Sequence, residues 1–226
     1  MAPTSSTEPE AAAGEVPADA SLLARHGPTL LGLARQCVSW RVRHAEELKV
    51  SPADYAPELG ARRASFVTLT KAGQLRGCVG SPAAWRSLVE DVANNAAAAA
   101  VEDRRFSPLE ADELDAIEIA ISLLSEVIPL AAESEAELIA KLRPGIDGLL
   151  IRETKPCPGT ERELLREDRS QALFLPQVWE HLPRPEEFLA QLKVKAGLPR
   201  DYWSASLEFR RFTTTSIAEP ARAAGS

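Results

Sequence analysis

The spacing of hydrophobic residues predicts helices and strands that alternate along most of the chain. Over residues 29–48, apolar side chains recur every three to four positions, which is the period of an amphipathic helix. Residues 64–70 and 74–79 are rich in β-forming residues and are joined by a short turn at 71–73, so an antiparallel hairpin is expected. Strict alternation over residues 115–123 predicts a strand with one buried face.

Capping residues indicate where further helices begin. Ser81 and Pro82 suit an N-cap and a first helical position, which predicts a helix from Pro82 to about Asp103. Ser134 is expected to cap a short helix over residues 134–142. The rest of the chain predicts, in order, a strand at 148–152, a charged excursion at 153–170, a strand at 172–175, helices at 176–181 and from 185 to before Gly197, and a strand over 206–217.

These elements indicate an α+β protein with a mixed or antiparallel sheet and flanking helices, because strands and helices interleave with hairpin-type neighbours. We expect one domain over residues 21–217. The ends, residues 1–20 and 218–226, are expected to be disordered tails, because segments rich in Ala, Pro, Glu and Ser have little to bury.

Composition and charge narrow the classes of function. The net charge is -7 and no basic cluster carries interleaved aromatic residues, which argues against a nucleic-acid surface. The first residues do not resemble a secretory signal and no apolar stretch is long enough to span a bilayer, so a cytoplasmic protein without membrane contact is expected. The three cysteines lie far apart without zinc-ligand spacing, so no disulfide framework, metal site or cofactor is predicted.

The stretch from Leu75 to Gly80 is the leading candidate for a functional site. Strand alternation places Arg76 and Cys78 on one face, just before the predicted helix start, and a guanidinium and a helix N-terminus both favour a thiolate. Gly77 and Gly80 lack side-chain bulk, which allows the close approach of a ligand or of another backbone. A packed cysteine with structural glycines is the competing interpretation, and the residues alone leave both open.

Four polar residues elsewhere complete the candidate set. A cysteine nucleophile normally needs a base, and His181 is the candidate base, against the interpretation of an ordinary helix-end histidine. Asp147 lies between two turns, while Asn95 and Gln177 carry amides. Each of these three can bind a ligand together with Arg76, or can instead satisfy backbone groups of the protein itself.

These residues also resemble a known family. The chain is similar, over roughly residues 22–217, to the AMMECR domain family, also called AmmeMemoRadiSam system protein A. The resemblance implies an α+β domain in which a smaller subdomain packs on a larger one that contains both chain ends. It also implies a Memo-type protein and a radical-SAM protein as partners, in a family without an agreed activity. The matching segments, in the family's order, are Phe66-Val67-Thr68-Leu69, Leu75-Arg76-Gly77-Cys78-Val79-Gly80, Asn95-Ala96, Asp103-Arg104-Arg105-Phe106, Ile117-Glu118-Ile119, Gly145-Ile146-Asp147-Gly148-Leu149 and Leu175-Pro176-Gln177-Val178.

Different classes of function remain open from these observations. The first is a cysteine-dependent enzyme or carrier, with Cys78 as a thiolate beside Arg76. The second is a non-catalytic module that uses the turn from Leu75 to Gly80 to bind a partner protein or a small ligand, either anionic or nucleotide-like. A pure adaptor that needs neither side chain is the third.

Overall fold

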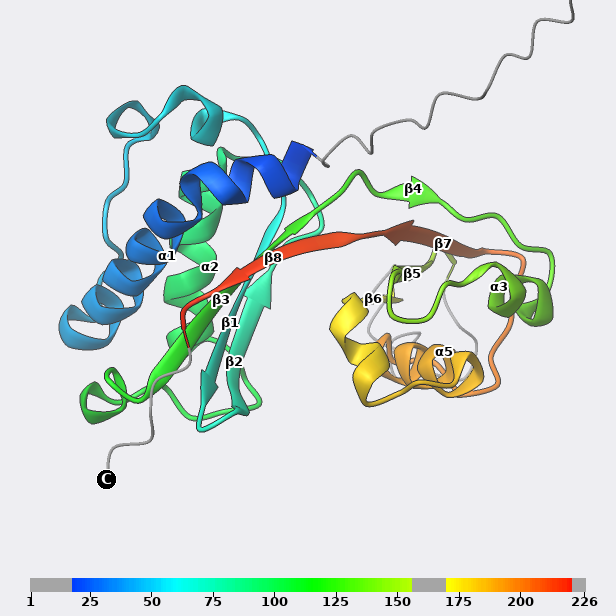
Figure 1. The fold of residues 1–226 in the computed structure, drawn as a ribbon. Helices are drawn as coiled ribbons and strands as arrows, with labels where there is room; N and C mark the ends of the chain where they lie inside the picture. Colours follow the sequence, from blue (N-terminus) through cyan, green and yellow to red (C-terminus); the bar gives the residue numbers. More distant parts are fainter. Residues whose placement is uncertain (1–17, 156–169, 221–226) are drawn as a thin grey trace, which may run out of the picture.

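The chain folds into two lobes, each built on a four-stranded sheet (Figure 1). The structure is a computed structural model that describes residues 18–155 and 170–220. Most of the predicted tails and most of the charged excursion at 153–170 lie outside these residues. Among the described residues, no helix is both long enough and apolar enough to cross a membrane.

The first lobe packs two helices against one face of its sheet. Its strands run in the order β2-β1-β3-β8, and every neighbouring pair is antiparallel. Alternate residues of β3, such as Ile119 and Ile121, are fully buried against the helices, as the alternation of the sequence predicts. The elements are α1 (Ala18–His44), the 3₁₀ turns η1 (Pro52–Asp54), η2 (Pro57–Gly60) and η3 (Ala111–Glu113), β1 (Ser65–Lys71), β2 (Gln74–Gly80), α2 (Leu88–Val101), β3 (Ile117–Leu124) and β8 (Thr214–Ala218).

The second lobe has its own sheet and its own core. Its strands run in the order β4-β7-β5-β6, again antiparallel. Trp179 stacks on Phe188 with ring centroids 3.8 Å apart, at the centre of a core that α5 and the sheet share. The elements are β4 (Ile128–Pro129), α3 (Glu135–Lys141), β5 (Gly148–Glu153), β6 (Ser170–Phe174), the 3₁₀ helix η4 (Pro176–Glu180), α5 (Pro185–Lys195) and β7 (Leu207–Phe212).

Two long strand segments cross side by side from one lobe to the other. One leads from β3 into β4 and the other from β7 into β8 (Figure 1). They stay paired between the sheets, because the amide of Ser125 donates to the carbonyl of Thr213 at 2.9 Å and the amide of Thr213 donates to Ser125 Oγ at 2.9 Å. A third hydrophobic cluster joins the lobes beside this crossing. We call it the junction core; its buried members are Ala64, Phe66, Leu124, Leu150 and Phe212.

The α+β class and the antiparallel hairpin of β1 and β2 are confirmed, whereas two predictions are wrong: the start of the helix after β2 and the single strand at 206–217. The helix expected to begin at Pro82 begins at Leu88. Ser87 is the true N-cap: its hydroxyl accepts from the amide of Glu90, and the Glu90 carboxylate accepts from the amide of Ser87. Ser81 instead holds a local turn through the amide of Ala83. The last predicted strand is two strands, β7 and β8, which belong to different sheets.

The junction core gives a direct test of how the lobes are held together. Phe212 is 2% exposed, and its ring lies over Gly148, where an added Cβ would come within 2.4 Å of it. Phe212→Ala is expected to lower the free energy of unfolding by about 3–5 kcal/mol, because it leaves a cavity between the lobes. Chemical denaturation measures this change. Trp85→Ala is the control, since Trp85 is 57% exposed; equal effects of the two substitutions would contradict the role of the junction core.

Candidate functional site at the lobe junction

Cys78 points from the first lobe toward the second. Its neighbour Gly77 faces α2, so strand alternation turns Cys78 to the opposite face of the sheet. There the half-buried thiol packs against the junction core together with Leu173 and Leu175 of the second lobe. The hydroxyl of Thr68, directly across on β1, donates to Cys78 Sγ at 3.4 Å.

Charged groups from both lobes surround this thiol. Asp103 accepts from the backbone amide of Cys78 at 2.9 Å and also binds the Arg105 guanidinium, with Nε at 2.9 Å and Nη2 at 2.6 Å. This pairing with Arg105 lowers the pKa of Asp103 to about 2. From the second lobe, Lys195 of α5 donates to the carbonyl of Leu173 at 2.9 Å.

The balance of these effects keeps the thiol protonated at neutral pH. Burial raises the pKa of Cys78 above its usual value, while the hydrogen bond from Thr68 and the charges of Arg105 and Lys195 act against burial and lower it. Burial is the largest of these effects. Cys78 is therefore expected to be a neutral thiol near two cations, which favours the packed cysteine over the thiolate among the two interpretations that the residues left open.

Arg76 is not the cation beside this thiol. Leu69 pairs with Gly77 and Thr70 pairs with Leu75, so Arg76 is an extra residue in a β-bulge that interrupts the alternation. Its guanidinium binds the Glu113 carboxylate, with Nε at 3.0 Å and Nη2 at 2.7 Å, and it also donates to backbone carbonyls of the 107–108 turn. The start of α2 at Leu88 likewise removes the helix N-terminus that was expected next to Cys78.

Three of the other predicted residues lie inside the first lobe. A Cβ on Gly77 would come within 2.2 Å of the Ala99 carbonyl oxygen, so this glycine lets β2 approach α2 closely. A Cβ on Gly80 would come within 2.4 Å of Phe66. Asn95 is buried, and its amide donates to the Ser65 carbonyl at 3.0 Å, as part of an internal polar network. In each case the contact is made with the protein itself.

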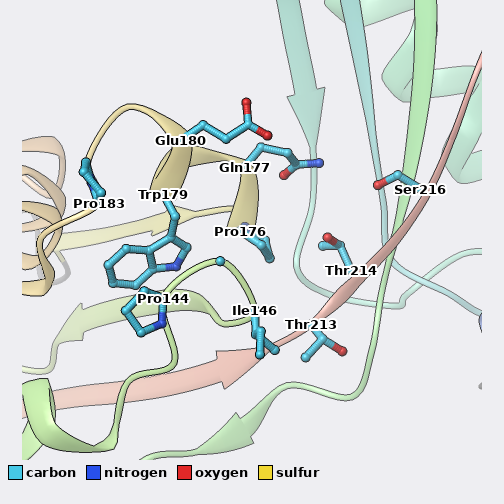
Figure 2. A pocket seen from close by; sticks show the side chains of 11 residues that line it. Pro144, Ile146, Pro176, Gln177, Trp179, Glu180, Pro183, Thr213, Thr214 and Ser216 are labelled. Carbon is cyan, nitrogen blue, oxygen red and sulfur yellow. The ribbon is translucent and has the colours of Figure 1, made fainter.

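A groove of about 780 Å³ lies between the lobes (Figure 2). η4 forms one side and the start of β8 forms the other, so the groove exists only because the lobes are held together. Gln177 reaches across it, and its amide nitrogen lies 3.2 Å from Ser122 Oγ of β3, which in turn lies 2.8 Å from Ser216 Oγ. The lining residues are Pro144, Gly145, Ile146, Pro176, Gln177, Trp179, Glu180, Pro183, Thr213, Thr214 and Ser216.

Asp147 does not line this groove but is buried behind one of its walls, which it supports. Its buried carboxylate accepts from the backbone amide of Arg143 at 3.0 Å and from the Arg143 guanidinium at 2.6 Å. Its carbonyl accepts from the indole of Trp179 at 2.7 Å. Asp147 thereby fixes the loop at 144–146 against η4. His181 is exposed at the end of η4, between the lining residues Glu180 and Pro183.

The structure thus brings only part of the predicted set together. Gln177 lines the groove and Asp147 supports it, while Cys78 lies at the junction core. Sequence reasoning missed Trp179, the hydroxyl-bearing residues of β8 and the cation Lys195, and it did not place Arg105 near Cys78. The run Thr213-Thr214-Thr215-Ser216 is the one signal that could have indicated a polar wall, whereas no local pattern singles out Lys195.

Comparisons with known proteins give a consistent result. The model of the AMMECR1 family matches residues 31–217. A protein of Methanothermobacter thermautotrophicus is 37% identical over 77% of this chain and 84% of its own length, and one of Thermofilum pendens is 34% identical over 88% and 92%. The crystal structure of PH0010 from Pyrococcus horikoshii superposes with a TM-score of 0.74 at 31% identity, covering 86% of this chain and 92% of that one.

The close approach at Gly77 predicts a specific loss of stability. Gly77→Ala is expected to cost about 1–3 kcal/mol, because the added methyl group forces β2 away from the α2 backbone. Gly32→Ala is the matched control: Gly32 lies in α1 with no atom within 4 Å of an added Cβ, so the change leaves stability equal or slightly higher. Thermal unfolding compares the two, and a neutral Gly77→Ala would show that the approach is not tight.

The protonated thiol predicts a distinctive pH dependence of alkylation. Below its raised pKa, Cys78 holds little thiolate, so its rate with a neutral reagent keeps rising beyond pH ~8.5, the usual thiol pKa. Cys37 is buried in the first lobe with a pKa raised to about 11, and it is expected to react more slowly still. Peptide mass spectrometry reports each cysteine separately. A Cys78 rate that levels off below pH ~7 would instead establish a thiolate.

Proposed function

The chain belongs to the AMMECR1 family, and we propose that it acts as a binding module that holds an extended segment of a partner protein in the groove between its lobes. The observation that carries this proposal is the groove itself. Both lobes contribute to it, it has room for several residues of a ligand, and Gln177 and Ser216 lie along it (Figure 2).

The lining of the groove suits a polypeptide better than an anion or a nucleotide. Trp179 and the prolines offer flat apolar surfaces, on which aliphatic side chains pack. Gln177, Thr214 and Ser216 offer amide and hydroxyl groups, which pair with the N–H and C=O groups of an extended backbone. Among the described residues, Glu180 is the one charged side chain of this lining, so they offer no cation there to hold a phosphate.

The Memo-type and radical-SAM proteins implied by the family resemblance are the expected source of the segment. A module of this kind needs no reaction of its own, because it brings a partner to a defined position. This role agrees with a Cys78 thiol that burial keeps neutral. It also agrees with an Arg76 whose guanidinium is held by Glu113 and by backbone carbonyls.

A cysteine-dependent enzyme or carrier is the second candidate, and one observation favours it. Arg105 and Lys195 both lower the pKa of Cys78. A change that exposed the thiol to water would remove the opposing effect of burial and leave the two cations dominant. In that case Cys78→Ser would abolish function while the groove stayed intact.

A substitution that fills the groove distinguishes the binding module from the cysteine-dependent enzyme or carrier. Ser216→Trp is expected to weaken binding to the Memo-type or radical-SAM protein at least ~10-fold, since the indole fills the space next to Gln177. Ala218→Trp is the matched control, because Ala218 is exposed on the same strand face but does not line the groove. Calorimetric titration measures both, and Cys78→Ser is expected to bind like the unmodified chain.

The opposite pattern would overturn the binding proposal. If Ser216→Trp bound as tightly as Ala218→Trp, the groove would not be the docking site. If Cys78→Ser alone lost function, the thiol chemistry of the second candidate would replace it.

A further inference from the structure

Two cations from different lobes converge beside Cys78, away from the residues that line the groove. A continuous chain of contacts connects them. Arg105 binds Asp103, and Asp103 holds the backbone amide of Cys78. The Cys78 side chain packs on the junction core together with Leu173, whose carbonyl accepts from Lys195. Arg105 therefore approaches the thiol from the first lobe and Lys195 approaches it from the second.

The cluster carries more positive charge than its own carboxylate neutralises. Both oxygens of Asp103 are already in use: Oδ1 accepts from the backbone amide and Nε of Arg105, and Oδ2 accepts from Arg105 Nη2 and from the Cys78 amide. Asp103 thus pairs with Arg105, whereas Lys195 has no carboxylate partner among residues 18–155 and 170–220; its ammonium lies over the Phe174 ring, 5.1 Å from the centroid. Lys195 is exposed at the surface, yet partial loss of water around its ammonium and then repulsion by Arg105 lower its pKa; the repulsion is the effect expected for neighbouring like charges.

Hydrogen-bond donors are also left over. An ammonium group has three N–H donors, and within residues 18–155 and 170–220 Lys195 Nζ donates only to the Leu173 carbonyl. Within the same residues, Arg105 uses Nε and Nη2 and keeps Nη1 free, on a side chain that is 55% exposed. Free donors on two neighbouring cations are the usual requirement for binding an oxyanion.

We propose that Arg105 and Lys195 form a binding site for a small oxyanion, a phosphate or carboxylate group, that bridges the two lobes beside Cys78. The ammonium and the guanidinium each donate to the anion, and its negative charge relieves their mutual repulsion. Because one cation comes from each lobe, the bound anion also links α5 to the turn that carries Arg105. This inference does not rest on the groove, because neither Arg105 nor Lys195 is among the residues that line it.

Cys78 itself reports whether the anion is bound. An anion between Arg105 and Lys195 screens both charges, and these charges lower the pKa of the thiol. Binding therefore reduces the thiolate fraction and slows alkylation of Cys78, whereas Cys37 in the first core is unaffected and provides an internal reference.

The experiment measures alkylation of the full chain by iodoacetamide at fixed pH and ionic strength, as sodium chloride is exchanged for sodium phosphate or sodium acetate. Phosphate or acetate is expected to slow Cys78 about three- to tenfold, in a saturable manner. In Lys195→Ala and Arg105→Ala, Cys78 is expected to be alkylated more slowly than in the unmodified chain before either anion is added. Phosphate and acetate are then expected to cause no further slowing. Arg104→Ala is the matched control, an exposed arginine next in sequence to Arg105, and it keeps the response.

Each outcome decides the proposal. A response to phosphate alone assigns a phosphate ligand, and a response to acetate alone assigns a carboxylate. If neither anion changes the alkylation rate of Cys78, the proposed site is wrong. It is also wrong if the anions still slow Cys78 in Lys195→Ala and Arg105→Ala. Ser216→Trp is expected to keep the full response, so failure of the groove proposal and failure of the anion site are distinguishable.

Discussion

The contact between the two lobes through the junction core is the constraint on which the rest of the structure depends. Each lobe has a sheet and a hydrophobic core of its own, so neither needs the other for its internal packing. Phe66 of the first lobe and Phe212 of the second both belong to the junction core, beside the paired crossing segments. This contact sets the separation of η4 from β8, and thereby the width of the groove. It also buries the Cys78 thiol and brings Lys195 within range of Arg105.

The motif from Leu75 to Gly80 is explained by the two faces of one strand. Gly77 allows α2 to lie close on one face, while Cys78 meets the second lobe on the other. Gly80 leaves space for Phe66 of the junction core. Arg76 lies in the β-bulge, where the alternation of side chains is interrupted, and its guanidinium binds the 107–113 segment. The motif therefore joins a helix, a strand and the neighbouring lobe. Its cysteine gains a charged environment as a consequence of that packing.

Several strands and one helix cap that follow from local sequence patterns were predicted correctly. Features that depend on contacts between residues far apart in the sequence were not. The hairpin and β3 follow from two-residue alternation, and the Ser134 cap follows from its side chain. The sequence predicted Ser81 as the cap of the helix after β2, but α2 begins after Ser87. The amide of Leu88, its first residue, donates to the carbonyl of Ala61, a contact that no local pattern contains. The bulge at Arg76 and the approach of Lys195 likewise depend on partners far away in the sequence. Gln177 was found because it lies in a recognisable segment, whereas Ser216 was not.

Hydrogen–deuterium exchange tests most directly whether the lobe junction is the functional surface. The amide exchange of the chain would be compared alone and in the presence of a Memo-type or radical-SAM protein, the partners proposed for it. Protection is expected to concentrate in residues 144–146, 176–183 and 213–216, on both sides of the groove. Protection confined instead to the helical face of the first lobe, around the exposed Trp40 and Trp85, would contradict it.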